Sequence, residues 1–283
     1  MPSQNRFSPL ASLAALMMTT SCVSPGGAEA PTSAAEVGEF RSGFLNGYLS
    51  RTQLPDSLAL LPAPPAQGSA AQAADDAAFH ELTKFRGTPR GALAVRDANV
   101  HFPEAAGVFS CALGVPIFDK ETPNAYMLLR RSLTDAGLAT YGAKDKYRRT
   151  RPLVAFNTPS CTPTEDATLA TDGSYPSGHS SIGWAWSLIL ASIAPDRADA
   201  ILQRGRAFGQ SRAICGAHWQ SDVESGRIIG AATVARLHAN PVFIAQVKAA
   251  QAKIAKERRD GAKPGGDCAQ EEAALAASSA LAP

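Results

Sequence analysis

The sequence has little net charge and no long apolar run. Among its 283 residues, 27 Lys and Arg balance 25 Asp and Glu, which gives a net charge of +2 with neutral histidines. So small a charge does not favour nucleic acid or an anionic membrane as a partner. A membrane-spanning helix needs roughly 20 apolar residues, whereas the uncharged segment 173–195 begins with polar, turn-forming residues. We therefore expect no membrane span and interpret that segment as a buried central helix.

Two common metal-binding spacings are also missing. No two cysteines have the C-x2-C spacing of a zinc site, and no two histidines have the H-x3-H spacing of a metal-dependent hydrolase. The histidines of the sequence are His80, His101, His179, His218 and His238. The sequence therefore predicts neither a metal nor any other cofactor.

The first 30 residues have the pattern of an export signal. Arg6 is the only charged residue before Glu29, an apolar stretch follows at 10–18, and small residues lead to Ala30. A basic start, a short apolar middle and a small-residue exit predict a cleaved signal peptide over 1–30. The tripeptide that ends at Cys22 partly fits a lipoprotein signal, so lipid attachment through Cys22 is the alternative.

The cysteines after the predicted signal are even in number, as is common in exported proteins with disulfides. They are Cys111, Cys161, Cys215 and Cys268. Two disulfides are therefore predicted, with three pairings between which the sequence does not choose. Four buried free thiols are the alternative.

Helical spacing of apolar residues dominates the body of the chain, and an alternating strand pattern is nearly absent. Helices are predicted near 74–86, over 89–111, from Thr122-Pro123, over 177–194, from Pro195-Asp196, over 218–237 and from Asn240-Pro241. The fold class is therefore all-α, with a single helical-bundle domain over 65–260 after a lead-in at 31–64. The Ala-, Gly- and Ser-rich segment 261–283 is predicted to be a mobile tail.

Three short segments concentrate the polar residues that an anion site needs. In the first, Lys144 and Arg151 stand seven residues apart, so two turns of one helix would place both on the same face. Pro152 would then end or bend that helix. A basic run of this kind is more often a solvated surface than a binding site.

The second segment is Pro-Ser-Gly-His at 176–179, directly before an apolar stripe that begins at Ile182. Ser177 and Gly178 at a helix start leave free backbone N–H groups, and the helix dipole adds positive potential there. His179, in the first turn, would lie beside a bound anion. Taken alone, the same residues also fit a plain serine N-cap with an incidental histidine.

The third segment runs from Ser211-Arg212 to His218 and Asp222. At an i,i+4 spacing the carboxylate can hydrogen-bond one ring nitrogen of His218 and leave the other free as a nucleophile or base. Arg212 adds a planar guanidinium suited to two phosphoryl oxygens. By itself, the His–Asp pair also fits a helix surface.

In this order, the three segments resemble the tripartite signature of the type 2 phosphatidic acid phosphatase superfamily, which includes the vanadium haloperoxidases. Further stretches resemble the bacterial class A nonspecific acid phosphatases: Leu-Leu-Pro-Ala-Pro-Pro at 60–65, Cys-Gly-Ala-His-Trp-Gln-Ser-Asp at 215–222 and His-Ala-Asn-Pro at 238–241. The resemblance covers residues 45–257. Cys111, Cys268 and the Ala-rich tail depart from the family pattern.

The resemblance implies a periplasmic enzyme that hydrolyses a broad range of small phosphomonoesters without a metal. It implies His218 as the nucleophile that forms a phosphohistidine, Asp222 as the residue that orients it, and His179 as general acid and later base. The residues implied to hold the phosphoryl oxygens are Lys144, Arg151, Ser177, Gly178 and Arg212. An acidic optimum is expected because His179 must be protonated to act. Phosphotransferase activity and a homo-oligomer are further expectations.

Three other functions use parts of the same pattern. A vanadium haloperoxidase would bind vanadate through His218, and a membrane lipid phosphatase would need several apolar spans that this chain does not offer. An exported phosphate-binding module would keep the anion site without turnover. Halide oxidation with vanadate and peroxide would indicate the first of these functions, and phosphate binding without hydrolysis the last.

Overall fold

The computed structural model describes residue 1 and residues 30–279, so Cys22 and nearly all of the predicted signal peptide lie outside the described residues. Within them, one antiparallel hairpin pairs β1 (Glu39–Arg41) with β2 (Phe44–Leu45). The described helices are α1 (Ala34–Val37), α2 (Ser57–Leu60), α3 (Ala70–Thr83), α4 (Pro89–Ala98), α5 (Ser110–Leu113), α6 (Pro123–Leu138), α7 (Tyr141–Tyr147), α8 (Pro152–Ala155), α9 (Asp166–Thr171), α10 (Gly178–Ile193), α11 (Ala198–Ile214), α12 (Gln220–Leu237), α13 (Pro241–Arg259) and α14 (Cys268–Ser279). The all-α prediction is confirmed.

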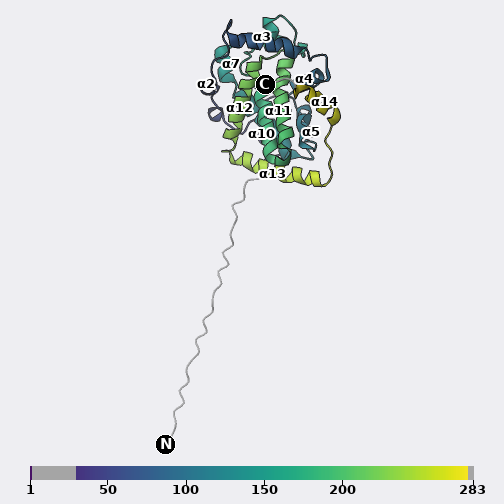
Figure 1. Ribbon diagram of the computed structural model, residues 1–283. Helices are drawn as coiled ribbons and strands as arrows, with labels where there is room; N and C mark the ends of the chain where they lie inside the picture. Colours follow the sequence, from purple (N-terminus) through teal and green to yellow (C-terminus); the bar gives the residue numbers. More distant parts are fainter. Residues whose placement is uncertain (2–29, 280–283) are drawn as a thin grey trace.

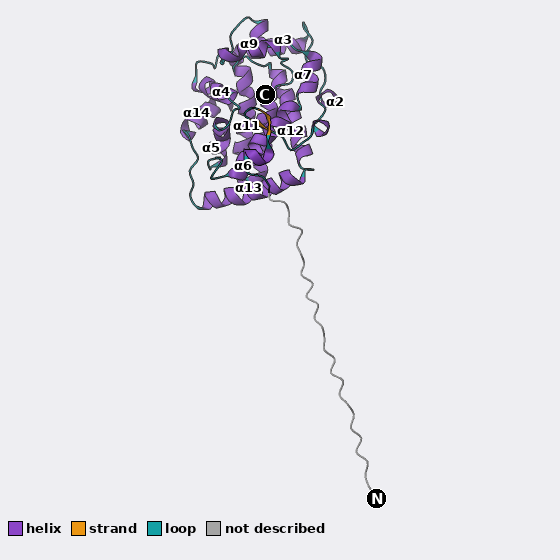
Figure 2. Cartoon of the chain, turned by 180° about the vertical axis from the view of Figure 1, so that it is seen from behind, coloured by secondary structure: helices purple, strands orange, loops and turns teal. Residues whose placement is uncertain are grey.

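Helix α10 lies at the centre of the bundle. Helices α6, α11 and α12 pack against it, and α3 and α13 lie across opposite ends of the central helices (Figure 1). Seen from behind, α4, α5 and α14 occupy one side, and α2 and α7 the other (Figure 2). Trp186 in α10 is fully buried, and its indole N–H donates to the carbonyl of Leu129 in α6 at 2.9 Å. The prediction of a buried central helix is confirmed.

Several helices begin where the sequence predicts. Ser177 caps α10, and its hydroxyl oxygen accepts the backbone N–H of Ser180 at 3.3 Å. Asn240 caps α13, with Pro241 at the first helical position. Thr122 stands at the N-cap of α6. Because these signals are local, they are readable without knowledge of the fold.

The helix predicted over 89–111 is wrong in extent. Helix α4 ends at Ala98, and a 3-10 turn over Glu104–Phe109 and the short α5 follow. The side chain of Asn99 accepts the backbone N–H of His101 at 2.8 Å, which is an alternative to the helical bond. Pro103 has no N–H to donate, so the helical ladder stops here.

The lead-in at 31–64 packs on the same core as the predicted domain. The Asp135 carboxylate in α6 accepts the backbone N–H groups of Tyr48 and Leu49 at 2.9 and 3.0 Å. Leu45 is fully buried in the main apolar cluster. Gly47 is needed here, since a Cβ would lie 2.0 Å from a carboxylate oxygen of Asp135. The N-terminal part of the described chain is therefore integral to the bundle.

Part of the segment 261–283, which was predicted to be a mobile tail, forms α14. Cys268 forms a disulfide with Cys111, and Glu271 lies 3.4 Å from the buried guanidinium of Arg204. Ala274 is buried as well, and α14 packs on α4. These contacts join distant segments, so local composition does not reveal them. The second disulfide joins Cys161 to Cys215, and the two bonds together decide between the three pairings.

No single helix among the described residues has both the length and the apolar composition to cross a membrane. Helices α12 and α13 satisfy those criteria only when taken together, and a bend of 97° separates them.

Two glycines allow α12 to approach α10 closely. A Cβ at Gly226 would lie 2.4 Å from the carbonyl oxygen of Ser177, and a Cβ at Gly230 would lie 2.4 Å from that of Ser181. The glycines are four residues apart and therefore face α10 together. Their contact brings the first turn of α12, with Asp222, against the start of α10, where Ser177 N–H donates to the Asp222 carbonyl at 2.9 Å.

Replacing Gly226 should therefore destabilise the bundle. We expect Gly226→Ala to lower the free energy of unfolding by about 1–3 kcal/mol, because the added methyl group forces the two backbones apart. Urea denaturation measures the change. Gly107→Ala is the control, since a Cβ at Gly107 would have no non-neighbouring atom of the described residues within 4 Å. Equal stability of the Gly226 variant and the wild type would contradict the close contact.

Candidate active site

The three motif segments meet at the end of α10 that Ser177 caps. Arg151, from the loop between α7 and α8, donates from Nη1 to the carbonyl of Ala217 at 2.9 Å. The start of α12 joins the start of α10 through Asp222 and Ser177. The candidate residues brought together here are Lys144, Arg151, Ser177, Gly178, His179, Arg212, His218 and Asp222. All of these residues therefore belong to one site.

Lys144 and Arg151 reach the site by a route that the sequence did not predict. The prediction of one helix with both on one face is wrong, because α7 ends at Tyr147 and Arg148 turns the chain with a φ of 41°. Arg151 then stands at the N-cap of α8. The two cations meet because the chain reverses direction between them.

The Asp172–Gly173 segment, which sequence analysis did not single out, binds both cations. Lys144 Nζ donates to the Gly173 carbonyl at 2.5 Å and to Asp172 Oδ2 at 3.3 Å. Arg151 donates from Nη2 to the same Oδ2 at 3.1 Å and from Nε to the Asp172 carbonyl at 3.0 Å. Burial, with the nearby charge of Arg151, lowers the pKa of Lys144 to about 8.

Arg212, in the last turn of α11, is fully buried. None of its three guanidinium nitrogens has a hydrogen-bond partner in the described part of the chain. Burial lowers the pKa of Arg212 to about 10, so the group remains charged at neutral pH. A buried charge without a partner is costly and calls for an explanation. An anionic ligand is the partner that its five N–H donors suit.

His218 lies in the loop before α12 and is buried. Its Nε2 is 3.0 Å from Arg151 Nη1, and its Nδ1 is 3.4 Å from Asp222 Oδ2. Because a guanidinium can only donate, Nε2 is the acceptor and Nδ1 carries the ring proton. Burial, with the charges of Arg151 and Lys144, lowers the pKa of His218 well below its ordinary value. The ring is therefore neutral, and its Nε2 faces a cation.

Arg149, which sequence analysis missed, holds the carboxylate of Asp222. Its Nη1 donates to Asp222 Oδ1 at 2.6 Å, and its Nη2 donates to Asp75 Oδ2 in α3 at 2.7 Å. Asp222 Oδ2 accepts the backbone N–H of Trp219 at 2.9 Å and faces His218. Burial raises the pKa of Asp222, and the charge of Arg149 opposes that shift. The basic run around Arg149 was visible in the sequence, but its partner Asp75 lies 74 residues away.

His179 lies in the first turn of α10 and is mostly buried. Its Nε2 donates to the carbonyl of Ala98, the last residue of α4, at 2.9 Å, which leaves Nδ1 of the neutral ring as an acceptor. Burial, with the charge of Arg212, lowers the pKa of His179 well below its ordinary value. The surroundings therefore favour a neutral ring, whereas sequence analysis expected a protonated one.

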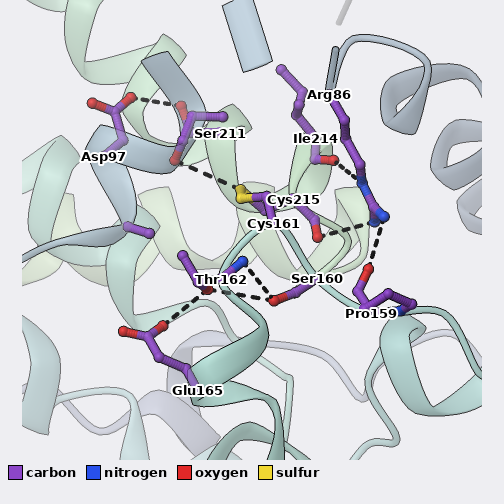
Figure 3. The surroundings of a disulfide bond; sticks show 12 residues. Arg86, Asp97, Pro159, Ser160, Cys161, Thr162, Glu165, Ser211, Ile214 and Cys215 are labelled. Carbon is purple, nitrogen blue, oxygen red and sulfur yellow. Dashed lines mark hydrogen bonds between the residues drawn. A yellow bond between two sulfur atoms is a disulfide. The ribbon is translucent and has the colours of Figure 1, made fainter. Parts of the chain in front are cut away.

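Arg86 fixes the backbone that follows α11 (Figure 3). Its guanidinium donates to the carbonyls of Ile214 and Cys215 at 3.0 Å each, and to that of Pro159 at 2.8 Å. Cys215 also forms the disulfide with Cys161. The loop between α11 and α12 is thereby tied to the segment that precedes α9.

The positive charge of the site comes from a cationic cluster, which we define as Lys144, Arg151 and Arg212. The N-terminus of α10 adds to it, since the first backbone N–H groups of a helix have no intrahelical acceptor. No group of three or more His, Cys, Asp or Glu side chains placed to hold a metal ion occurs in the described residues. The cluster and the helix N-terminus together suit a tetrahedral oxyanion.

The helical bundle and its anion site define a protein of the PAP2 superfamily, whose family model matches residues 125–243. The chain is 45% identical over 213 residues to the non-specific acid phosphatase of Providencia stuartii, across 75% of this chain and 86% of that protein. It is 42% identical over 201 residues to the non-specific acid phosphatase of Salmonella typhimurium, across 71% and 79%. It is 39% identical over 209 residues to the acid phosphatase of Zymomonas mobilis, across 74% and 79%. The chain belongs to the family of these acid phosphatases within that superfamily.

The network around Arg149 should contribute strongly to stability. We expect Arg149→Met to lower the free energy of unfolding by about 3–5 kcal/mol, because Asp222 and Asp75 would then be buried without their shared cation. Arg148→Met is the control: Arg148 is the exposed neighbour, and its loss should change stability by about 0.5 kcal/mol or less. Urea denaturation at neutral pH measures both. Equal effects of the two substitutions would contradict the bridging role of Arg149.

Proposed function

We propose that this protein is an exported acid phosphatase that hydrolyses small phosphomonoesters through a phosphohistidine formed on His218. The observation that carries the proposal is the buried guanidinium of Arg212, which no described residue hydrogen-bonds. The backbone carbonyl of Arg212 accepts the N–H of His218 at 3.3 Å, so the unpaired guanidinium and the neutral histidine belong to adjoining parts of the chain. A phosphoryl group would complete the hydrogen bonds of that guanidinium. The activity named for the relatives, acid phosphatase, supports the same conclusion.

The first half of the reaction begins at Nε2 of His218. Arg151 Nη1 first gives up its hydrogen bond to Nε2 and donates to a phosphoryl oxygen instead. The lone pair of Nε2 then forms a bond to phosphorus while the ester P–O bond breaks and the alcohol oxygen leaves with the bonding electrons. Nδ1 keeps its proton beside Asp222, whose negative charge stabilises the positive charge that develops on the ring. The cationic cluster and the N-terminus of α10 stabilise the negative charge on the equatorial oxygens.

His179 handles the proton of the leaving group. The surroundings of His179 favour a neutral ring, so the ring does not bring a proton of its own. We propose that the substrate supplies the proton, because a phosphomonoester has a second pKa of about 6 and its monoanion still carries one. The monoanion binds with this proton, and Nδ1 of His179 accepts it and passes it to the alkoxide oxygen as the ester P–O bond breaks. In the second half, His179 accepts a proton from the water that attacks phosphorus, and the P–N bond to His218 breaks.

Metal independence and export belong to the same proposal. The cationic cluster supplies the charge that many phosphoryl-transfer enzymes obtain from metal ions. The first 30 residues supply the export signal, so we propose a periplasmic location after cleavage. Lipid attachment through Cys22 is the alternative form of export.

Loss of the nucleophile should abolish turnover. For His218→Ala we expect hydrolysis of p-nitrophenyl phosphate to fall by about 10⁴-fold, because only binding and charge stabilisation would remain. EDTA should leave the wild-type rate unchanged. The control is His101→Ala, which removes an exposed histidine outside the site and should keep wild-type turnover. If the His218 variant retained most of its activity, His218 would not be the nucleophile.

An alcohol acceptor tests the covalent intermediate. An alcohol can attack the phosphohistidine in place of water, so a high concentration of glycerol should release more p-nitrophenol than inorganic phosphate. The two products are measured in the same reaction. Equal amounts at every glycerol concentration would contradict phosphotransferase activity.

The pH dependence tests the source of the proton. The pKa values of His179 and His218 both lie well below the ordinary histidine value, so neither ring should titrate on the alkaline side. We expect kcat/KM to fall above the second pKa of the substrate, about 6, and to fall in acid as His218 gains a proton. With aryl and alkyl phosphomonoesters, the alkaline limb should move with the pKa of each substrate. An alkaline limb at one pH for all substrates would assign it to the protein.

A further inference from the structure

The carboxylate of Asp172 binds two members of the cationic cluster. Its Oδ2 accepts from Lys144 Nζ at 3.3 Å and from Arg151 Nη2 at 3.1 Å. The two cations are buried, with 4% and 2% of their side chains exposed, whereas the side chain of Asp172 is 36% exposed. The Asp172 carboxylate, at the edge of the site, therefore accepts hydrogen bonds from N–H groups that would also donate to a bound phosphoryl group.

Backbone carbonyls hold the same two cations without help from that carboxylate. The Gly173 carbonyl accepts from Lys144 Nζ at 2.5 Å and from Arg151 Nη2 at 3.3 Å, and the Asp172 carbonyl accepts from Arg151 Nε at 3.0 Å. A further carbonyl, that of Ala217, accepts from Arg151 Nη1 at 2.9 Å. The positions of the cations thus depend on main-chain contacts. What the Asp172 side chain adds is its negative charge.

We propose that the Asp172 carboxylate is a built-in competitor for the phosphoryl site, which the substrate displaces and which returns as phosphate leaves. The proposal rests on the phosphatase function above and concerns the affinity of that same site. With Asp172 bound, the three cations carry one compensating negative charge, so their net attraction for inorganic phosphate is weaker. Because the carboxylate is partly exposed, it can turn into water when phosphate arrives, and its hydration there offsets the lost contacts with the two cations. Weaker binding of the product shortens the time that phosphate occupies the site.

Removing the charge while keeping the shape tests this competition. We expect Asp172→Asn to bind inorganic phosphate roughly tenfold more tightly in calorimetry. The substitution removes a negative charge that repels phosphate and that partly neutralises Lys144 and Arg151. The same variant should show a correspondingly lower inhibition constant for phosphate. Asp145→Asn is the matched control: it removes an equal charge from an exposed position next to Lys144, where the described structure has no hydrogen bond from either cation to the carboxylate. Its phosphate affinity should change by less than about twofold.

The outcomes separate this inference from the proposed function. If the wild type hydrolyses phosphomonoesters and the Asp172 variant binds phosphate as the wild type does, or as tightly as the Asp145 variant, the competition is absent. Weaker phosphate binding by Asp172→Asn would show instead that the carboxylate positions the cations, which also overturns the proposal. A wild type that neither binds phosphate nor turns over substrate would overturn the proposed function itself and this inference with it.

Discussion

Burying the guanidinium of Arg212 costs free energy that no described residue offsets with a hydrogen bond. The same burial makes the charges of Arg212, Lys144 and Arg151 act strongly on one another and on nearby groups, because little water screens them. Together with desolvation, these charges keep the ring of His218 neutral. An anion is the ligand that offsets this clustering of positive charge, so the proposed binding of phosphate and the neutral state of the histidine would have the same physical cause.

A cluster of like charges persists only where the surrounding frame prevents the side chains from moving apart. Here the frame is the close contact of α10 with α12, which Gly226 and Gly230 permit. Arg86 and the second disulfide fix the loop that follows α11. Arg149 joins α3 to Asp222 and so fixes the carboxylate that faces His218. Each of these contacts connects segments that are distant in the chain.

The sequence predicted the elements whose signals are local. Ser177 before an apolar stripe begins α10 as expected, and the three motif segments contain residues that do lie together. Other features were not readable, because they depend on an unmarked turn or on partners remote in the chain. Lys144 and Arg151 do not share a helix, since Arg148 turns the chain between them. Part of the tail is ordered against α4, where Cys268 is joined to Cys111.

By itself, the sequence determined which residue types are available for chemistry and where the main helices begin, because caps, prolines and apolar spacing act over a few residues. Only the tertiary structure decided how those residues are charged and paired. The neutrality of His179, the bridge from Arg149 to Asp75 and the contact of Asp172 with two cations all depend on burial and on groups remote in the chain. Electrostatic interactions depend on distance in space and on exclusion of water, and neither quantity is encoded by neighbouring residues alone.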